Sequence, residues 1–234
     1  MKKLFALSAV ILAFGCAELQ QVAQQYPQLG TISNADIAAG LKEALNNGIK
    51  KEVTKLTATD GFYKNEAVKI LLPAELQKVD QTLRSIGLSS LADEGLKVLN
   101  RAAEDAVKEA TPIFVDAVTK MSFTDARNIL MGNETSATTY LQNSTSAALY
   151  SKFNPVVKNS FSKVGADKVW ANIITRYNQV PMVKDVNPDL SDYVTNKAME
   201  GVFKMVAVEE VQIRNDINAR TSDLLRRVFS LQDN

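Results

Sequence analysis

The sequence contains no histidine and only one cysteine, Cys16, in 234 residues. The lack of histidine excludes Ser-His-Asp and Cys-His nucleophilic catalysis, a histidine general base, and histidine-ligated zinc or iron. Glycine and proline are also scarce, at 10 and 6 residues, which disfavours a loop-rich β fold. No phosphate-binding glycine loop is present. The remaining possibilities are carboxylate, lysine or tyrosine chemistry, an oxygen-only metal site, or binding without a reaction.

The chain also lacks an excess of charge of either sign. The chain has 27 basic and 26 acidic residues, and no long run of either sign interrupts the mixture. A nucleic-acid-binding protein normally has a basic surface or a basic arm. We therefore expect no nucleic-acid partner.

The first fifteen residues have the three-part organisation of a signal peptide. Two lysines begin the chain, an apolar run covers residues 4–14, and Gly15 precedes Cys16. The run is shorter than the about 20 residues that a transmembrane helix needs, and it is typical of a signal-peptide core. Residues 12–16 (LAFGC) resemble the lipobox of bacterial lipoproteins. We predict cleavage before Cys16 and lipidation of its thiol. The alternatives are an ordinary cleaved signal peptide with an incidental cysteine, or a buried first helix.

Lipidation would place the protein in the cell envelope, attached to a membrane by its acyl chains. Ala17 follows the cysteine, where some bacteria use an acidic retention signal, so an outer-membrane location facing the periplasm is favoured. Residues 16–32 would form the lipidated cysteine and a glutamine-rich tether. Residues 33–234 would form the body, which contains no apolar segment of membrane-spanning length.

Apolar periodicity predicts an all-α fold for this body, a single domain of about eight helices. The clearest stripe has apolar residues at steps of four: Ile37, Leu41, Leu45, Ile49 and Val53. Pro155 is expected to interrupt the helix that begins near residue 135. The short apolar run 67–72 is either extended or the end of a helix, and residues 180–188 are expected to form a loop. The other expected helices cover residues 73–86, 90–107, 111–121, 126–131, 166–179, 189–213 and 219–231.

Several ordered motifs resemble one bacterial family across roughly residues 32–230. These motifs are residues 39–45 (AGLKEAL), 60–62 (DGF), 99–104 (LNRAAE), 124–126 (TDA), 137–141 (ATTYL), 193–195 (YVT), 201–203 (GVF), 209–210 (EE) and 213–214 (IR). The sequence is similar to the domain-of-unknown-function family DUF4197. The resemblance implies a helical envelope protein with a signal peptide or lipobox. It implies no activity and no functional residues.

Two polar clusters lie in the first half of the domain. Asn100, Arg101 and Glu104 occur among alanines, and the spacing of four puts Asn100 and Glu104 on one helix face. They could line a polar groove, or they could form a hydrogen-bonded clamp between elements. The second cluster contains Asp125 and Arg127 and is followed by Thr138, Thr139 and Tyr140. Asp125 follows Ser122 by three residues, which favours a helix cap over a catalytic acid.

A third polar cluster contains Glu209, Glu210 and Arg214. Glu210 and Arg214 are spaced for an ion pair along one helix. A hard cation such as calcium could also be held by carboxylate oxygens of Glu104, Asp125 and one of the two later glutamates. No spacing resembling an EF-hand loop accompanies these residues. The sequence therefore predicts no metal and no cofactor.

These features favour a non-enzymatic binding or scaffold protein of the envelope, with a membrane, an envelope protein or a small apolar ligand as partner. One alternative is an envelope enzyme that uses carboxylates, which would bring its charged candidates into one pocket. Another is a helical carrier with Tyr140, Trp170, Tyr177 and Phe203 around an apolar cavity. These aromatic residues could equally form ordinary core.

Overall fold

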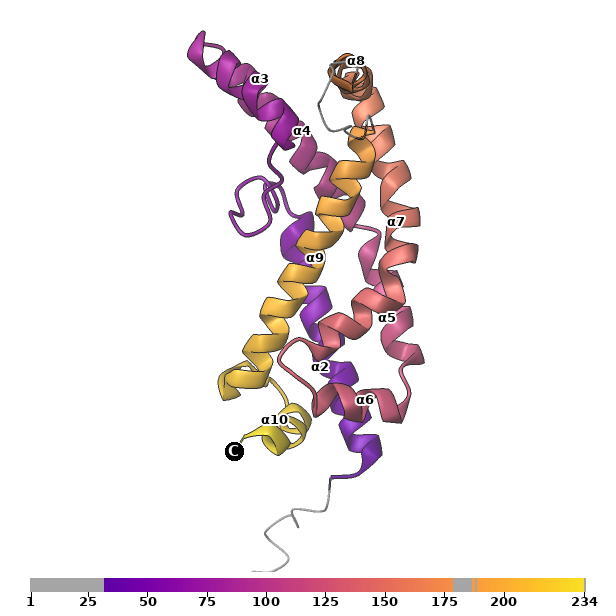
Figure 1. Ribbon diagram of the computed structural model, residues 1–234. Coiled ribbons are helices and arrows are strands. Elements are labelled where there is room, and N and C mark those ends of the chain that lie inside the picture. The colour runs from indigo at the N-terminus through magenta and orange to yellow at the C-terminus, as the bar shows by residue number, and fades with distance from the viewer. Residues whose placement is uncertain (1–31, 179–186, 188, 234) are drawn as a thin grey trace, which may run out of the picture. The chain divides into compact units, whose positions relative to one another are not determined.

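A computed structural model describes residues 32–178, 187 and 189–233 of the chain (Figure 1). Asn34–Asn234 form one compact unit, distinct from Met1–Ser33. The predicted signal peptide, Cys16 and nearly all of the tether lie outside the described residues. So do residues 180–186 and 188 of the expected loop.

The described chain is all-α, as predicted, and contains no β-strand. The α-helices in chain order are α2 (Asn34–Thr57), α3 (Ala74–Ser85), α4 (Ser89–Val107), α5 (Ala110–Lys120), α6 (Phe123–Leu130), α7 (Ser136–Val164), α8 (Ala166–Asn178), α9 (Leu190–Asn215) and α10 (Asp223–Phe229). Two short 3-10 helices, η1 (Ile217–Ala219) and η2 (Ser230–Gln232), flank α10. In this described part, no helix combines the length and apolar character needed to cross a bilayer.

Helix α2 places its predicted apolar stripe in the core. The stripe residues are buried, and α2 packs against α9, α6, α5 and α10. Burial of each large aliphatic side chain contributes about 1.5–3 kcal/mol of transfer free energy.

Helix α9 is the other central element and packs against α7, α2 and α4. The ring of Phe203 on α9 meets that of Phe114 on α5 edge to face, with centroids 5.8 Å apart. Gly201 lets α9 approach the loop after α2, since a Cβ there would lie 2.8 Å from the Phe62 ring. Asp189 begins the helix as its N-cap and accepts hydrogen bonds from the backbone N–H groups of residues 191 and 192.

Helix α7 differs from the prediction. It is continuous through Pro155, where the sequence predicts an interruption. Proline inside a helix typically costs about 3 kcal/mol because it removes one backbone hydrogen bond and clashes with the preceding turn. Phe153, Val157 and Phe161 are fully buried on both sides of it. Their packing holds the two halves in one helix, which ends at Gly165 with φ 71°.

Candidate functional site

The structure distributes the seven predicted polar residues over three places. One cluster holds the loop after α2, a single residue caps α6, and three residues line a pocket between α2 and α9. In that order, the groups are Asn100, Arg101 and Glu104; Asp125; and Glu209, Glu210 and Arg214. These residues therefore do not come together in a single enzyme site.

Asn100 on α4 is fully buried and binds the backbone of the apolar run that follows α2. Its side-chain oxygen accepts a hydrogen bond from the Ile70 N–H at 2.8 Å, and its nitrogen donates to the Ile70 carbonyl at 2.9 Å. The same nitrogen donates to the Leu96 carbonyl at 2.8 Å. Asn100 thus satisfies both backbone groups of Ile70, which lies in the non-helical stretch 69–73 and has no helical partners for them.

Arg101 and Glu104 hold the turn that ends α2. The Glu104 carboxylate accepts from the Phe62 N–H at 3.1 Å and from Arg101 at 2.5 Å. Arg101 also binds Asp60 at 2.5 Å. Its hydrogen bond to Glu104 raises the pKa of Arg101, and the Lys64 ammonium lowers the pKa of Asp60. These contacts support the clamp interpretation of this cluster.

Asp125 forms a reciprocal cap at the start of α6 with Ser122. The Asp125 N–H donates to the Ser122 hydroxyl at 3.1 Å, and the Ser122 N–H donates to the Asp125 carboxylate at 3.1 Å. The side-chain hydrogen bond from Ser122 is the main cause that lowers the pKa of Asp125. The carboxylate therefore acts as the predicted helix cap.

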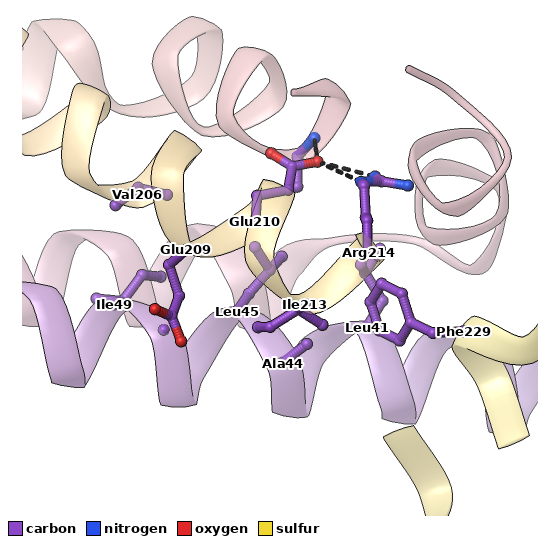
Figure 2. A pocket seen from close by; sticks show the side chains of 12 residues that line it. Leu41, Ala44, Leu45, Ile49, Val206, Glu209, Glu210, Ile213, Arg214 and Phe229 are labelled. Atoms are coloured by element: carbon purple, nitrogen blue, oxygen red, sulfur yellow. Dashed lines mark hydrogen bonds and ion pairs between the residues drawn. The ribbon is translucent and has the colours of Figure 1, made fainter. Parts of the chain in front are cut away.

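The pocket lies between α2 and α9 and is mostly apolar (Figure 2). Its lining consists of Leu41, Ala44, Leu45, Gly48, Ile49, Ala137, Val206, Glu209, Glu210, Ile213, Arg214 and Phe229. The space that the centre of a water molecule can reach is about 20 Å³. This is room for roughly one water, whereas ligand pockets typically measure about 300–1,000 Å³. The pocket as described is too small for an apolar cargo.

The two glutamates of the pocket point in different directions. Figure 2 shows Glu209 directed towards α2, whereas Glu210 faces Arg214. Glu209 forms an ion pair of 2.5 Å with Lys51, a half-exposed residue of α2. Across the α2–α9 contact, a Cβ on Gly48 would lie 3.0 Å from the Glu209 side chain. Glu209 therefore forms part of the contact between these helices.

Glu210 and Arg214 form a buried pair, 7% and 6% exposed, that joins three helices. One oxygen of Glu210 accepts from the Ala137 N–H at 2.9 Å, and the other accepts from the Thr138 N–H at 2.8 Å. The Thr138 hydroxyl donates to the second oxygen at 2.8 Å. The Thr135 side chain at the start of α7 forms no cap hydrogen bond. Glu210 on α9 therefore caps the first backbone N–H groups of α7 instead.

Arg214 serves the end of α6 in the same way. Its guanidinium donates to the carbonyls of Ile129 at 2.9 Å and Leu130 at 3.0 Å, in addition to Glu210 at 2.8 Å. These carbonyls lie in the last turn of α6, beyond its regular i→i+4 pairing, and the Ile129 carbonyl also accepts a hydrogen bond from the Gly132 N–H at 3.1 Å. The pair therefore fixes the α6–α7 junction to α9.

Arg220 is a buried charged residue with a structural role that sequence reasoning missed. It is 2% exposed, donates to the carbonyls of Ile213 and Arg214 at 3.1 and 2.8 Å, and pairs with Asp233 at 2.5 Å. It thus caps the end of α9. A basic residue just past a helix end is the available sequence signal, but nothing in the sequence distinguishes a buried arginine from an exposed one.

No metal centre is formed by the residues that the structure describes, and the predicted aromatic cavity is only partly described. Among them, no group of three or more His, Cys, Asp or Glu residues is placed to hold a metal ion. Phe203 is buried in the core and Tyr140 is half-buried. The side chains of Trp170 and Tyr177 lie outside the described ones.

The fold and these contacts define a helical protein whose buried charges connect helix ends. The family described as "Protein of unknown function (DUF4197)" matches residues 31–230. The chain belongs to the DUF4197 family. No curated protein and no solved structure shows significant similarity to it.

Proposed function

We propose that the protein is an envelope lipoprotein, attached to the outer membrane through Cys16 and facing the periplasm, with a non-enzymatic binding or scaffold role. The non-enzymatic part of the proposal rests on how the buried charged side chains at the pocket are bonded. Both oxygens of Glu210 and three nitrogens of Arg214 are bound by protein groups. These charges are committed to holding the fold.

A catalytic carboxylate must reach a proton or a reacting atom of a substrate. Glu104 is bound to Phe62 and Arg101, and Asp125 is bound to Ser122. Glu209 is bound to Lys51. Each predicted acidic candidate therefore has a structural partner, and Glu104 and Asp125 lie outside the pocket that Glu209 and Glu210 line. This arrangement favours the binding or scaffold role over the carboxylate enzyme.

The anchor part of the proposal is supported by the sequence of residues 1–16 and is tested at Cys16. In cells supplied with labelled fatty acid, we expect the parent chain to carry the label and to fractionate with membranes. Cys16→Ser should lose the label and leave the membrane fraction, because a thioether requires the thiol. Ala17→Ser, which keeps the cysteine, is the matched control. Unchanged labelling and fractionation of Cys16→Ser would contradict the anchor.

The binding role is tested separately by native mass spectrometry of residues 17–234 purified gently from a bacterial periplasm. A reproducible additional mass that is lost on denaturation would identify a bound small molecule. A bare chain would instead direct the search to protein partners. Hydrolysis of a cell-wall or lipid substrate that is abolished by Glu209→Gln, with folding unchanged, would contradict the non-enzymatic role.

A further inference from the structure

We propose that the end of the helical domain where α2 begins docks on the bilayer and inserts Met131, Ile217 and Leu231 into its interfacial region. This inference rests on the proposed lipid anchor and adds an orientation to it. The bilayer is the occupant of this surface, which we call the apolar end patch. The patch consists of these three residues.

Each residue of the apolar end patch has a large apolar side chain and lies in a turn that follows a helix. Met131 comes directly after α6 and is 60% exposed, Ile217 lies in η1 and is 60% exposed, and Leu231 lies in η2 and is 41% exposed. Single exposed apolar residues are ordinary on protein surfaces, whereas a group of them marks an interaction site.

Hydrogen bonds from α9 and from η2 meet at one backbone carbonyl at the end of α6. The carbonyl of Leu130 accepts a hydrogen bond from Arg214 at 3.0 Å and another from the side chain of Gln232. Met131 directly follows Leu130, and Leu231 directly precedes Gln232. Ile217 lies in the turn after α9, beyond Arg214. The three patch residues therefore lie close in sequence to the groups that join α6, α9 and η2.

The chain enters the domain beside this patch. The Asp36 carboxylate in the first turn of α2 lies 4.0 Å from the guanidinium of Arg227 on α10. A Cβ on Gly40 would lie 2.7 Å from Val228, so α10 packs directly on the start of α2. Leu231 follows Arg227 by four residues. Figure 1 shows the start of α2, α6, α10 and the end of α9 at the same end of the helical domain.

The proposed anchor ties this end of the domain to the membrane. The segment 17–32 can reach at most about 55 Å when fully extended. Helix α7, with 29 residues, is itself about 43 Å long by helical rise. A covalent tether at the near end raises the local concentration of the patch at the bilayer, so weak insertion of a few apolar side chains suffices.

The composition of the chain allows the orientation to be tested independently of natural lipidation. A polyhistidine tag in place of Cys16 attaches the chain to vesicles of phosphatidylethanolamine, phosphatidylglycerol and a nickel-chelating lipid. The chain has no histidine that would compete for nickel and no other cysteine. Met131→Cys therefore provides a unique thiol for an environment-sensitive fluorophore. Val164→Cys, at a side chain that is 59% exposed at the other end of α7, is the matched control.

On attachment to vesicles, we expect the fluorophore at position 131 to shift to shorter wavelength and brighten by about twofold or more as it enters the interface. Doxyl-labelled lipids should quench it, and the control at position 164 should respond to neither. Ile217→Ser combined with Leu231→Ser should reduce the response at position 131. Circular dichroism verifies that each variant is folded, and a label at position 217 repeats the test if Met131→Cys unfolds.

An unchanged spectrum at both patch positions, or an equal response at position 164, would overturn the orientation. A response that depends on protein concentration in the absence of vesicles would assign the patch to a second copy of the chain and would also overturn it. Because the tag replaces the natural anchor, these outcomes are independent of the Cys16 labelling test. The proposed anchor and the proposed orientation can therefore fail separately.

Discussion

Glu210→Ala is the perturbation that most directly tests how the buried pair holds the domain. The substitution removes the acceptor of the Ala137 and Thr138 backbone N–H groups at the start of α7. It also leaves the Arg214 guanidinium buried with only the backbone carbonyls of α6 as partners. Both effects act on the same junction, between the end of α6 and the start of α7.

The expected loss of unfolding free energy follows from the burial of the pair. Removing one partner of a buried ion pair typically costs about 3–5 kcal/mol because the other charge is left without compensation. The loss of a helix N-cap is worth about 0.5–2 kcal/mol and is partly included in that value. For a domain of this size, the total corresponds to a decrease in Tm of roughly 6–20 °C.

Urea unfolding followed by circular dichroism measures this loss. Glu200→Ala is the matched control, because Glu200 pairs with Lys197 on the same helix but is 63% exposed. An exposed pair contributes about 0–1 kcal/mol, so the control should retain nearly all of its stability. A loss below about 1 kcal/mol for Glu210→Ala would refute the reasoning.

A double variant separates the unpaired charge from the missing cap. Combining Glu210→Ala with Arg214→Met removes the charge that the single variant leaves buried. The double variant should therefore be less destabilised than the sum of the two single variants, with an interaction energy of roughly 1–3 kcal/mol. Additive losses would show that the two side chains act independently.

Three further predictions concern other parts of the domain. Asn100→Ala should cost roughly 2–4 kcal/mol in urea unfolding, because it leaves buried backbone groups of residue 70 unpaired, and should accelerate amide exchange there. In thermal melts, Gly95→Ala should stabilise by about 0.5–1 kcal/mol, since its Cβ meets no atom within 4 Å, whereas Gly201→Ala should destabilise by roughly 1–3 kcal/mol through its clash with a buried ring. Because the folded pKa of Asp125 is lowered, its contribution is present above the unfolded pKa of about 3.9 and is lost as pH falls through the folded value. Urea unfolding from pH 6 to pH 2 should thus show a shallower acid loss for Asp125→Asn, and an unchanged slope would contradict the cap.

Local sequence signals predicted much of the helical pattern because the physical causes are local. The apolar stripe of α2, the cap formed by Ser122 and Asp125, and the stop at Gly165 each depend on residues within a few positions of one another. Pro155 was predicted wrongly because its cost is local whereas the burial that outweighs it comes from other helices.

The candidate polar residues show the limit of the same reasoning. The spacing of Glu210 and Arg214 predicted a pair along one helix, which the structure contains at 2.8 Å. Their main partners lie about 70 to 85 residues earlier in the chain, at the ends of α6 and α7. No periodicity within α9 reports such partners. The sequence could not decide between a polar groove and a clamp at Asn100 for the same reason, because its partner Ile70 is 30 residues away.

The residues that join the end of α6 to the start of α7 lie on α9, much later in the chain, and this affects the order of folding. Helices α6 and α7 are synthesised one after the other, yet their junction depends on Glu210 and Arg214, which come near the end of the chain. Contacts of this separation form late, because a long loop must be closed before they can stabilise anything. The nascent chain therefore lacks the connector between α6 and α7 until α9 is complete. In the export proposed for this chain, the segments made first would therefore be without their final partners.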